Sequence, residues 1–504
     1  MLLYTGALTS KPYAFTARPW ELRSVQSVDI LDGMGSNIRV DFKETEILRI
    51  LPRRNLEINE SWISDKARFF YDGLKRQRLN SPYMKINGEL KKVKWSKILK
   101  NLTSVLKVYS FEFGHSKIGV LCGASCDTET FFTVRDLALS FGFSNLGIDR
   151  ELKVATDEPS SYLFKGEFKD LEKTDFCLFV GTNPRFEAST LNLRLRKLFR
   201  RGNFTASSIG GHFSTTFPVQ SLGLTSKTLL DFVEGRHPSC KLFSKAKNPV
   251  ILYGSHLLER VDSRGIQSLF GSLSASLLTL FGKSVFVNPL HTDSNVVGAF
   301  ELGYGTLKID AINGLKVLYG VGLENKNILK RIGKAEKENR SVLVIQDSHG
   351  STVTTKADFV LPVTTFVEKN SIYYNMEGRP QKTQRALVGP NLSRDDWRIF
   401  RVLFSSLKKS TSYITQAQLV TEASKILPSL YFANSWFLHR ESSIAHLSLF
   451  VPFKKEKVLF SYLKLPIEDF YMTHRLCQSS RIMAKASQYL RSYFHNYKFL
   501  VKSN

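Results

Sequence analysis

The sequence predicts an α/β protein in which a small N-terminal β-rich unit precedes doubly wound α/β domains and a helical C-terminal tail. Two patterns favour the doubly wound part. Its short apolar runs are continuous rather than alternating, as in strands buried on both faces of a parallel sheet. Each run leads through a loop into an amphipathic segment, and such strand–loop–helix repeats imply right-handed crossovers. Over the 504 residues, the expected units are 1–100, 101–405 and 406–504.

The first unit contains the alternating segment SVDILDGMGSNIRVDFKETEILRILPR, which includes a Gly-containing turn. Alternation with a period of two predicts a small antiparallel β-sheet. The apolar residues expected in its core are Val28, Ile30, Ile38, Val40, Ile47 and Leu48.

The segment INESWISDKARFFYDGLKRQRL follows, and from Asp65 onwards it predicts a single helix with Ser64 or Asp65 as the N-cap. Acidic residues near its start and basic residues near its end suit the helix dipole. Arg68 and Asp72 are spaced as neighbours on one face. Trp62 is expected to anchor the start of this helix against the body. We interpret the segment as a structural brace formed by Trp62, Asp65, Arg68, Asp72 and Arg76.

From about residue 101 the strand–loop–helix plan recurs. Its expected strands are KIGVLC, DFCLFV, NPVILYG, LKVLYG, SVLVIQD and ADFVLP. Ligands in doubly wound folds bind at the carboxyl ends of the strands, where the loops of these repeats lie. The last part of the chain, LPIEDFYMTHRLCQSSRIMAKASQYLRSYF, predicts a tail or docking helix.

The composition is basic, with a net charge of +26 from 71 Lys and Arg against 45 Asp and Glu. This balance favours polyanionic partners, but a basic subunit of an organelle or an assembly explains it equally well. The five Cys residues are too scattered for a disulfide framework, which indicates a reducing compartment. No run of 18 apolar residues predicts a membrane-spanning helix.

Few motifs point to chemistry. Cys122 and Cys126 lack the second Cys pair that a zinc or iron–sulfur site needs, so two small core thiols are the favoured interpretation. The histidines form no metal-binding spacing, and no nucleophile has an arranged base. The sequence therefore predicts no catalytic residue and no metal ligand.

The loop VGTNPRFEAS is more specific, because it joins an expected strand to a helix whose N-terminal N–H groups could bind an anion. The alternative is a tight connection without a ligand. The residues concerned are Gly181, Thr182, Asn183, Pro184 and Arg185.

Two further segments are weaker candidates for binding an anion. YGVGLE, which ends at Glu324, resembles the strand-to-helix loop VGTNPRFEAS less closely. The basic helix that follows this loop could bind a polyanion, although a solvated face or a subunit contact is favoured. It contains Arg194, Arg196, Lys197, Arg200 and Arg201.

The segment ADFVLPVTTFVEKNSIYYNMEGRPQKTQRAL concentrates polar residues around an aromatic hairpin. Charged groups packed this densely need partners. The segment is either a ligand-facing loop or a buried polar brace between domains. Its candidate residues are Glu368, Asn375, Glu377, Gly378, Arg379 and Gln381.

These segments, in this order, resemble one family: the large iron–sulfur subunit of respiratory complex I (NADH:ubiquinone oxidoreductase), often called the 75-kDa subunit. The matching pieces are SKPYAFTARPWELRSVQSVDILDGMGSNIRV, INESWISDKARFFYDGLKRQRL, VGTNPRFEASTLNLRLRK, ADFVLPVTTFVEKNSIYYNMEGRPQKTQRAL with RDDWRIFR, and IEDFYMTHRLCQSSRIMAKA. Together they extend over nearly the whole chain.

The resemblance implies a molybdopterin-oxidoreductase-like body behind a Cys-rich, ferredoxin-like part that carries iron–sulfur clusters. Residues 1–121 contain no Cys, and thiolates are the main cluster ligands. We therefore expect no cofactor on this chain. The clusters would lie on a separate ferredoxin-like polypeptide, and the loop at Gly181 would be a vestige of a pterin-dinucleotide site.

The resemblance also implies partners and a location. The expected partners are the ferredoxin-like part and other matrix-arm subunits, with no nucleic acid and no membrane span. The expected location is the matrix side of the mitochondrial inner membrane, and an organelle-encoded origin fits the short segment before the first match. The alternatives are an active molybdopterin-dependent oxidoreductase, which would need a metal ligand, and a basic nucleic-acid-binding protein.

Overall fold

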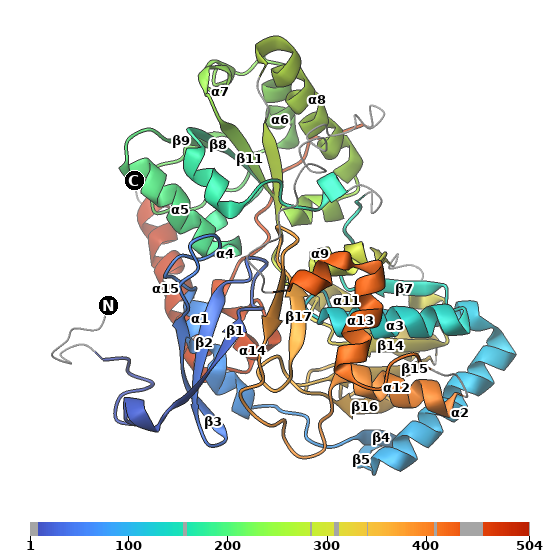
Figure 1. The fold of residues 1–504 in the computed structure, drawn as a ribbon. Helices are drawn as coiled ribbons and strands as arrows, with labels where there is room; N and C mark the ends of the chain where they lie inside the picture. Colours follow the sequence, from blue (N-terminus) through green and yellow to red (C-terminus); the bar gives the residue numbers. More distant parts are fainter. Residues whose placement is uncertain are drawn as a thin grey trace.

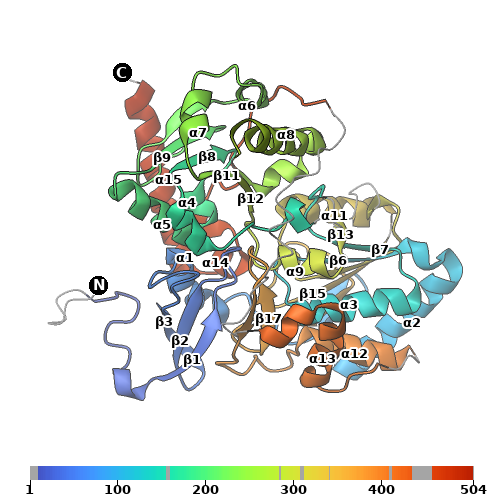
Figure 2. The same cartoon turned by 45° about the horizontal axis from the view of Figure 1, so that its top comes forward.

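The computed structural model describes residues 9–154, 159–282, 285–306, 312–339, 341–407, 411–433 and 457–502. These residues form an antiparallel β-unit, two α/β parts that are each built on a separate sheet, and a C-terminal helix that runs beside the β-unit (Figure 1 and Figure 2). The predicted fold class is confirmed.

The β-unit is a three-stranded antiparallel sheet of β1 (Arg23–Val28), β2 (Asn37–Lys43) and β3 (Glu46–Pro52). The expected core residues are buried, except Leu48, which is half-buried. The register between β2 and β3 shifts in front of Phe42, whose partner is Ile47 rather than Leu48. This shift is a β-bulge that leaves Leu48 as the extra residue of β3, which explains why its side chain is only half-buried. Ile50, which is not among the expected core residues, is buried instead.

The expected single helix is wrong. Helix α1 (Asp65–Phe69) is one short α-helical stretch, and the chain continues as the 3-10 helix η2 (Phe70–Lys75). Ser64 is confirmed as the N-cap, because its hydroxyl accepts a hydrogen bond from the Ala67 N–H at 3.1 Å. The tighter turn places Gly73 against helix α14 (Arg475–Gln478) near the end of the chain. A Cβ at Gly73 would lie 2.2 Å from the Leu476 carbonyl oxygen.

The large sheet of the body has the order β13-β7-β6-β14-β15-β16-β4-β5, parallel from β13 to β16 and antiparallel at β4 and β5. Since β4 and β5 extend this sheet, the body begins before the expected boundary at residue 100. Its strands are β4 (Tyr83–Ile86), β5 (Glu89–Lys92), β6 (Ile118–Cys122), β7 (Asn145–Ile148), β13 (Gly305–Thr306), β14 (Val317–Val321), β15 (Val342–Asp347) and β16 (Phe359–Pro362).

The small sheet is parallel throughout and has the order β10-β9-β8-β11-β12. It is inserted in the chain between β7 and β13, a nesting that no sequence pattern indicates. Its strands are β8 (Phe176–Val180), β9 (Thr205–Ile209), β10 (Gln220–Gly223), β11 (Pro249–Gly254) and β12 (Phe286–Leu290). A separate hairpin consists of β17 (Ser371–Tyr374) and β18 (Pro380–Thr383).

Helices cover both sheets. The α-helices are α2 (Trp95–Phe113), α3 (Thr128–Phe141), α4 (Pro184–Glu187), α5 (Ser189–Arg200), α6 (Ser226–Val233), α7 (Cys240–Lys245), α8 (Ser263–Phe281), α9 (Val296–Glu301), α11 (Lys326–Asn339), α12 (Asp396–Ser406), α13 (Gln416–Ile426), α14 (Arg475–Gln478) and α15 (Arg481–Lys502). The other 3-10 helices are η1 (Pro19–Glu21), η3 (His115–Lys117), η4 (Pro159–Ser161), η5 (Phe168–Lys173), η6 (Ser255–Glu259), η7 (Pro428–Phe432) and η9 (Phe470–Met472).

The expected helical tail is helical in part. Residues 434–456 lie outside the described residues. Residues 457–465 contain no helix, and α14 and α15 follow. Helix α15 packs against α1 and η2, so the end of the chain returns to the β-unit (Figure 1).

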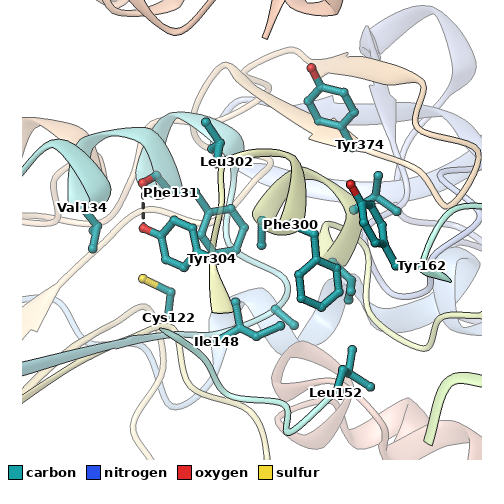
Figure 3. Close-up of a cluster of buried hydrophobic side chains, with 14 of the residues drawn as sticks. Cys122, Phe131, Val134, Ile148, Leu152, Tyr162, Phe300, Leu302, Tyr304 and Tyr374 are labelled. Carbon is teal, nitrogen blue, oxygen red and sulfur yellow. Dashed lines mark hydrogen bonds between the residues drawn. The ribbon is translucent and has the colours of Figure 1, made fainter. Parts of the chain in front are cut away.

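An aromatic cluster fills the core between α3 and the large sheet (Figure 3). The Tyr304 hydroxyl donates to the Phe131 carbonyl at 2.7 Å, and the two rings lie 5.0 Å apart between centroids. Cys122 is fully buried in this cluster, and burial raises the pKa of its thiol. Cys122 is therefore a core thiol, whereas Cys126 is partly accessible.

Candidate functional site

A pocket of about 70 Å³ lies at the carboxyl ends of β6, β14, β15 and β16. The chain runs from β6 to β7 on one side and from β14 to β15 and β16 on the other, so the strand order reverses between β6 and β14. Doubly wound folds bind ligands at such a position. We call it the switch-point pocket. Its polar lining includes Ser125, Cys126, Asp127, Glu324, Ser348, Lys369, Asp396, His474 and Arg475.

One side of the pocket holds a buried ammonium group between two carboxylates. Lys369 Nζ pairs with Asp396 Oδ2 at 2.6 Å and also with Asp127 Oδ2. Burial opposes the charge of Lys369, but the two carboxylates raise its pKa well above the ordinary value. Asp127 also caps α3 by accepting from the Thr130 N–H at 2.7 Å, and Asp396 accepts from Gln346 at 2.8 Å. The ammonium therefore joins α3 to α12.

The other side holds the guanidinium of Arg475. Its Nε donates to Glu324 Oε1 at 2.9 Å, and its terminal nitrogens donate to Asp347 and to the Gly322 carbonyl. His474 Nε2 lies 3.0 Å from the same Glu324 oxygen. Burial raises the pKa of Glu324 to about 7 and lowers that of His474, so the imidazole is neutral.

The loop amides beside this pocket are also occupied from within. Asp149 follows β7, and its carboxylate accepts from the N–H groups of Ala124 at 2.9 Å, Glu324 at 2.7 Å and Asn325 at 3.0 Å. Backbone N–H groups at strand ends are the usual ligands of a phosphate. Here a carboxylate of the chain itself takes their hydrogen bonds.

In the predicted anion loop at the small sheet, VGTNPRFEAS, a carboxylate of the chain also accepts the hydrogen bonds that an anion would otherwise take. Gly181 adopts a φ of 55°, and the loop leads into the short helix α4. Glu187 Oε1 accepts from the Thr182 hydroxyl at 2.7 Å and from the Asn183 N–H at 2.6 Å. Asn183 Oδ1 accepts from the Arg185 N–H at 3.2 Å. The two donors nearest to the strand end therefore bind Glu187.

Replacing Glu187 with glutamine is expected to remove part of the pH dependence of stability. Burial raises the pKa of Glu187 to about 8 from 4.5. The folded protein keeps this proton while the unfolded chain releases it, so stability falls as the pH rises between these values, by at most about 1.4 kcal/mol per pH unit. Urea unfolding at pH 5 and pH 8 should show a smaller fall for Glu187→Gln. The exposed Glu46→Gln is the control, and parallel curves for all three proteins would contradict the assignment.

The polar cluster around the β17–β18 hairpin connects separate parts of the chain. Asn375 Oδ1 accepts from the N–H groups of Glu377 at 3.1 Å and Arg379 at 2.9 Å, in a turn that Gly378 completes with a φ of 77°. Arg379 pairs with Glu57 of the β-unit region, and Gln381 Nε2 donates to the Gly35 carbonyl at 3.0 Å.

Two carboxylates of this segment are buried. Glu377 accepts from the Phe168 N–H, and burial raises its pKa to about 7. Glu368 forms a bidentate pair with Arg78, with both N–O distances at 2.7 Å. The contacts of Arg379 and Gln381 thus reach the β-unit region, whereas Glu377 is bound within the body and Glu368 binds the segment between η2 and β4.

The residues of the predicted brace helix have other contacts than expected. Asp72 pairs with the start of α15 rather than with Arg68: its carboxylate accepts from Ser480 Oγ, from the Arg481 N–H at 2.9 Å and from the Ile482 N–H at 3.2 Å. Trp62 is 56% exposed, so it is not buried against the body. The same segment holds Asp65, which is exposed, and Arg68 and Arg76, which are half-buried.

The basic helix α5 is only partly a solvated face. Arg194 is buried, and its guanidinium donates to Glu172 at 2.9 Å and to the carbonyl oxygens of Leu56 at 2.6 Å and Glu57 at 2.9 Å. Its charge therefore ties α5 to the β-unit region. An arginine in a basic helix gives no sequence signal for such a contact.

Within the part of the chain that the structure describes, no group of three or more His, Cys, Asp or Glu residues is arranged to hold a metal ion. Among the same residues, no helix is both long and apolar enough to cross a membrane.

The fold and the position of the switch-point pocket place the body of the chain in the class of molybdopterin oxidoreductases. Residues 78–406 match the family model of molybdopterin oxidoreductases. The structure of acetylene hydratase from Pelobacter acetylenicus is similar in fold, with a TM-score of 0.55 at 12% identity, covering 76% of this chain and 69% of that one.

Closer relatives then identify the family. The NADH-ubiquinone oxidoreductase 75 kDa subunit of Reclinomonas americana is 37% identical over 96% of this chain and 70% of its own length. The mitochondrial 78 kDa subunits of Candida albicans and Neurospora crassa are 36% and 34% identical; the first match covers 95% of this chain and 66% of the relative, and the second covers 96% and 64%. The chain belongs to this family of complex I subunits, and it spans roughly two thirds of the length of these relatives.

One expectation is contradicted. Residues 22–72 match the model described as the NDSU1/NuoG-like 4Fe-4S domain. An iron–sulfur domain of the family is therefore part of this chain. The expectation that this chain carries no cofactor, and that the iron–sulfur clusters lie only on a separate polypeptide, is wrong. The residues present do not fit ordinary cluster ligation, because 22–72 contain neither Cys nor His.

The residues present do not fit a molybdopterin cofactor either. The switch-point pocket of about 70 Å³ is far below the 300–1,000 Å³ typical of small-molecule sites. Its charged side chains pair with one another, and Asp149 and Glu187 take the hydrogen bonds of the strand-end amides.

Proposed function

We propose that this chain is a core subunit of the NADH-oxidising arm of mitochondrial complex I, on the matrix side of the inner membrane, with other complex I subunits as partners. It supports electron transfer from NADH towards ubiquinone as a scaffold and is not catalytic by itself. The observation that carries this proposal is the similarity to 75 and 78 kDa subunits along nearly the whole chain.

The contacts described above support a scaffold. Arg78, Asp72, Arg194 and Arg379 each join segments that are far apart in the sequence. Asp72, Arg194 and Arg379 fasten the 4Fe-4S-type domain to α15 and to the α/β body. Arg78 joins the start of the body to Glu368. Such buried ionic contacts fix the geometry of a subunit more than they add to its stability.

The proposal is tested by purifying the tagged full-length chain from its own cells. We expect it in an assembly that oxidises NADH with a quinone acceptor, at one copy per assembly and without molybdenum or tungsten. A chain that purifies away from every NADH-oxidising assembly would contradict the proposal. One atom of either metal per chain would favour a molybdopterin enzyme instead.

The further interpretation that a separate ferredoxin-like polypeptide completes the subunit stays a prediction. Mass spectrometry of the purified assembly tests it. A distinct Cys-rich chain in equal amount supports it, and continuous peptides that join a Cys-rich segment to residue 9 and beyond contradict it.

Replacing Trp62 with alanine is expected to lower incorporation into the assembly several-fold while the chain stays folded, because the indole is exposed and its loss leaves no cavity. Phe111→Ala, which removes an exposed ring of α2, is the matched control. Native gels and circular dichroism give the two readouts. Normal assembly of Trp62→Ala with lost electron transfer would show that Trp62 does not act in assembly.

A further inference from the structure

Residues 459–476, which we call the C-terminal strap, cross the carboxyl edge of the small sheet. The buried Leu463 donates its N–H to the Leu224 carbonyl at 3.0 Å and accepts from the Gly211 N–H at 2.9 Å. His256, which follows β11, bonds to the Lys464 carbonyl at 2.7 Å. Since Gly211 follows β9, the strap covers the loops on both sides of β8, including the neighbourhood of the predicted anion loop.

The same strap then reaches the large sheet. Arg475 is at its end, and every acceptor of the guanidinium belongs to the body: the Gly322 carbonyl and Glu324 follow β14, and Asp347 ends β15. Each of the three guanidinium nitrogens has an acceptor. The planar fork of an arginine matches such a set, whereas the compact ammonium of a lysine does not.

We infer that Gly322, Glu324 and Asp347, at one side of the switch-point pocket, form a guanidinium-binding site of the α/β body, and that Arg475 occupies this site in cis as the end of the C-terminal strap. The side chain of Arg475 occupies the edge of the sheet where a diffusible ligand would bind. The strap thereby closes the ligand edges of both sheets and couples their relative positions. This inference does not depend on membership of an assembly, because all of its contacts lie within one chain.

The test is chemical rescue of the full-length Arg475→Ala protein. The variant should melt about 5 °C below the wild type, because two buried carboxylates lose their cation. Millimolar guanidinium chloride, far below denaturing concentrations, should raise its melting temperature in a saturable way. Sodium chloride and urea at equal concentrations should not. The wild type and Arg398→Ala, which lacks an exposed arginine, should show no rise. Absence of rescue in a folded Arg475→Ala protein would overturn the inference.

A second variant covers the case in which Arg475→Ala does not fold. Arg475→Lys keeps the charge and much of the side chain, but its single nitrogen cannot reach the three acceptors that bind three separate nitrogens of the guanidinium. Hydrogen exchange should then accelerate together in two places, at residues 470–476 of the strap and at 322–325 of the body. Faster exchange in the strap with unchanged exchange at 322–325 would show that the body does not depend on the guanidinium, and would overturn the inference.

Discussion

Arg78→Ala is expected to lower the free energy of unfolding by about 3–5 kcal/mol, the usual cost of breaking a buried ion pair. The side chains of Arg78 and Glu368 are 8% and 5% exposed, and the two terminal guanidinium nitrogens donate to the two carboxylate oxygens. Removing the cation leaves a buried carboxylate whose remaining bond comes from the Thr365 N–H at 2.8 Å. Urea unfolding of the purified chain measures the loss.

The pair between Lys75 and Glu46 is the matched control for this prediction. Its N–O distance is 2.6 Å, as short as in the buried pair, but its side chains are 50% and 53% exposed. Exposed pairs contribute about 0–1 kcal/mol, so Lys75→Ala should be nearly neutral. Equal losses for Arg78→Ala and Lys75→Ala would show that burial does not decide the strength of these contacts. Arg78→Lys should fall between the two, because an ammonium has a single nitrogen and loses the two parallel N–H···O bonds that the guanidinium makes.

Lys369→Met is expected to cost a similar amount, about 3–5 kcal/mol at neutral pH. Asp127 and Asp396 would then face each other in the switch-point pocket without their shared cation. Burial and the nearby Asp127 already raise the pKa of Asp396 above 3.8, and loss of the ammonium would raise it further.

The pH dependence separates this cause from simple loss of packing. In Lys369→Met the folded state keeps a proton on the Asp396 carboxyl, whose pKa is raised, whereas the unfolded chain has released it, so the stability of the variant falls as the pH rises above about 4. Its deficit relative to the wild type should shrink when the pH is lowered towards 4. A deficit that does not change with pH would mean that the methylene contacts of Lys369, and not its charge, hold α3 and α12 together. Adding Asp396→Asn should recover part of the loss at neutral pH.

Local patterns predicted those strands that are continuous and apolar, such as β6, β8, β11, β14 and β15. They did not indicate β9, with its sequence TASSI, or β12, with FVNPL, because a Ser-rich or Pro-containing strand has no clear hydrophobic signature. The bulge at Leu48 and the change from α-helix to 3-10 helix after Phe69 were also missed. Both depend on what the segment packs against.

The candidate sites divide in the same way. Glu368, Asn375, Glu377, Arg379 and Gln381 stood out in the sequence as an unusually polar segment, and the structure gives each of them a partner. The groups around the switch-point pocket did not stand out. Asp149, Lys369 and Arg475 are single polar residues in ordinary surroundings, and a signal for them existed only in their positions after strand ends or in the tail.

The sequence by itself determined the α/β class, the strand–loop–helix repeats and the family, because hydrophobic period, turn residues and ordered motifs are local properties of the chain. Only the tertiary structure decided that the small sheet is nested within the large one, that Asp72 caps α15 rather than pairing with Arg68, and that Arg475 binds Glu324 at one side of the switch-point pocket. The physical reason is distance along the chain: a buried charge is stable only beside its partner, and these partners come together only when the chain has folded.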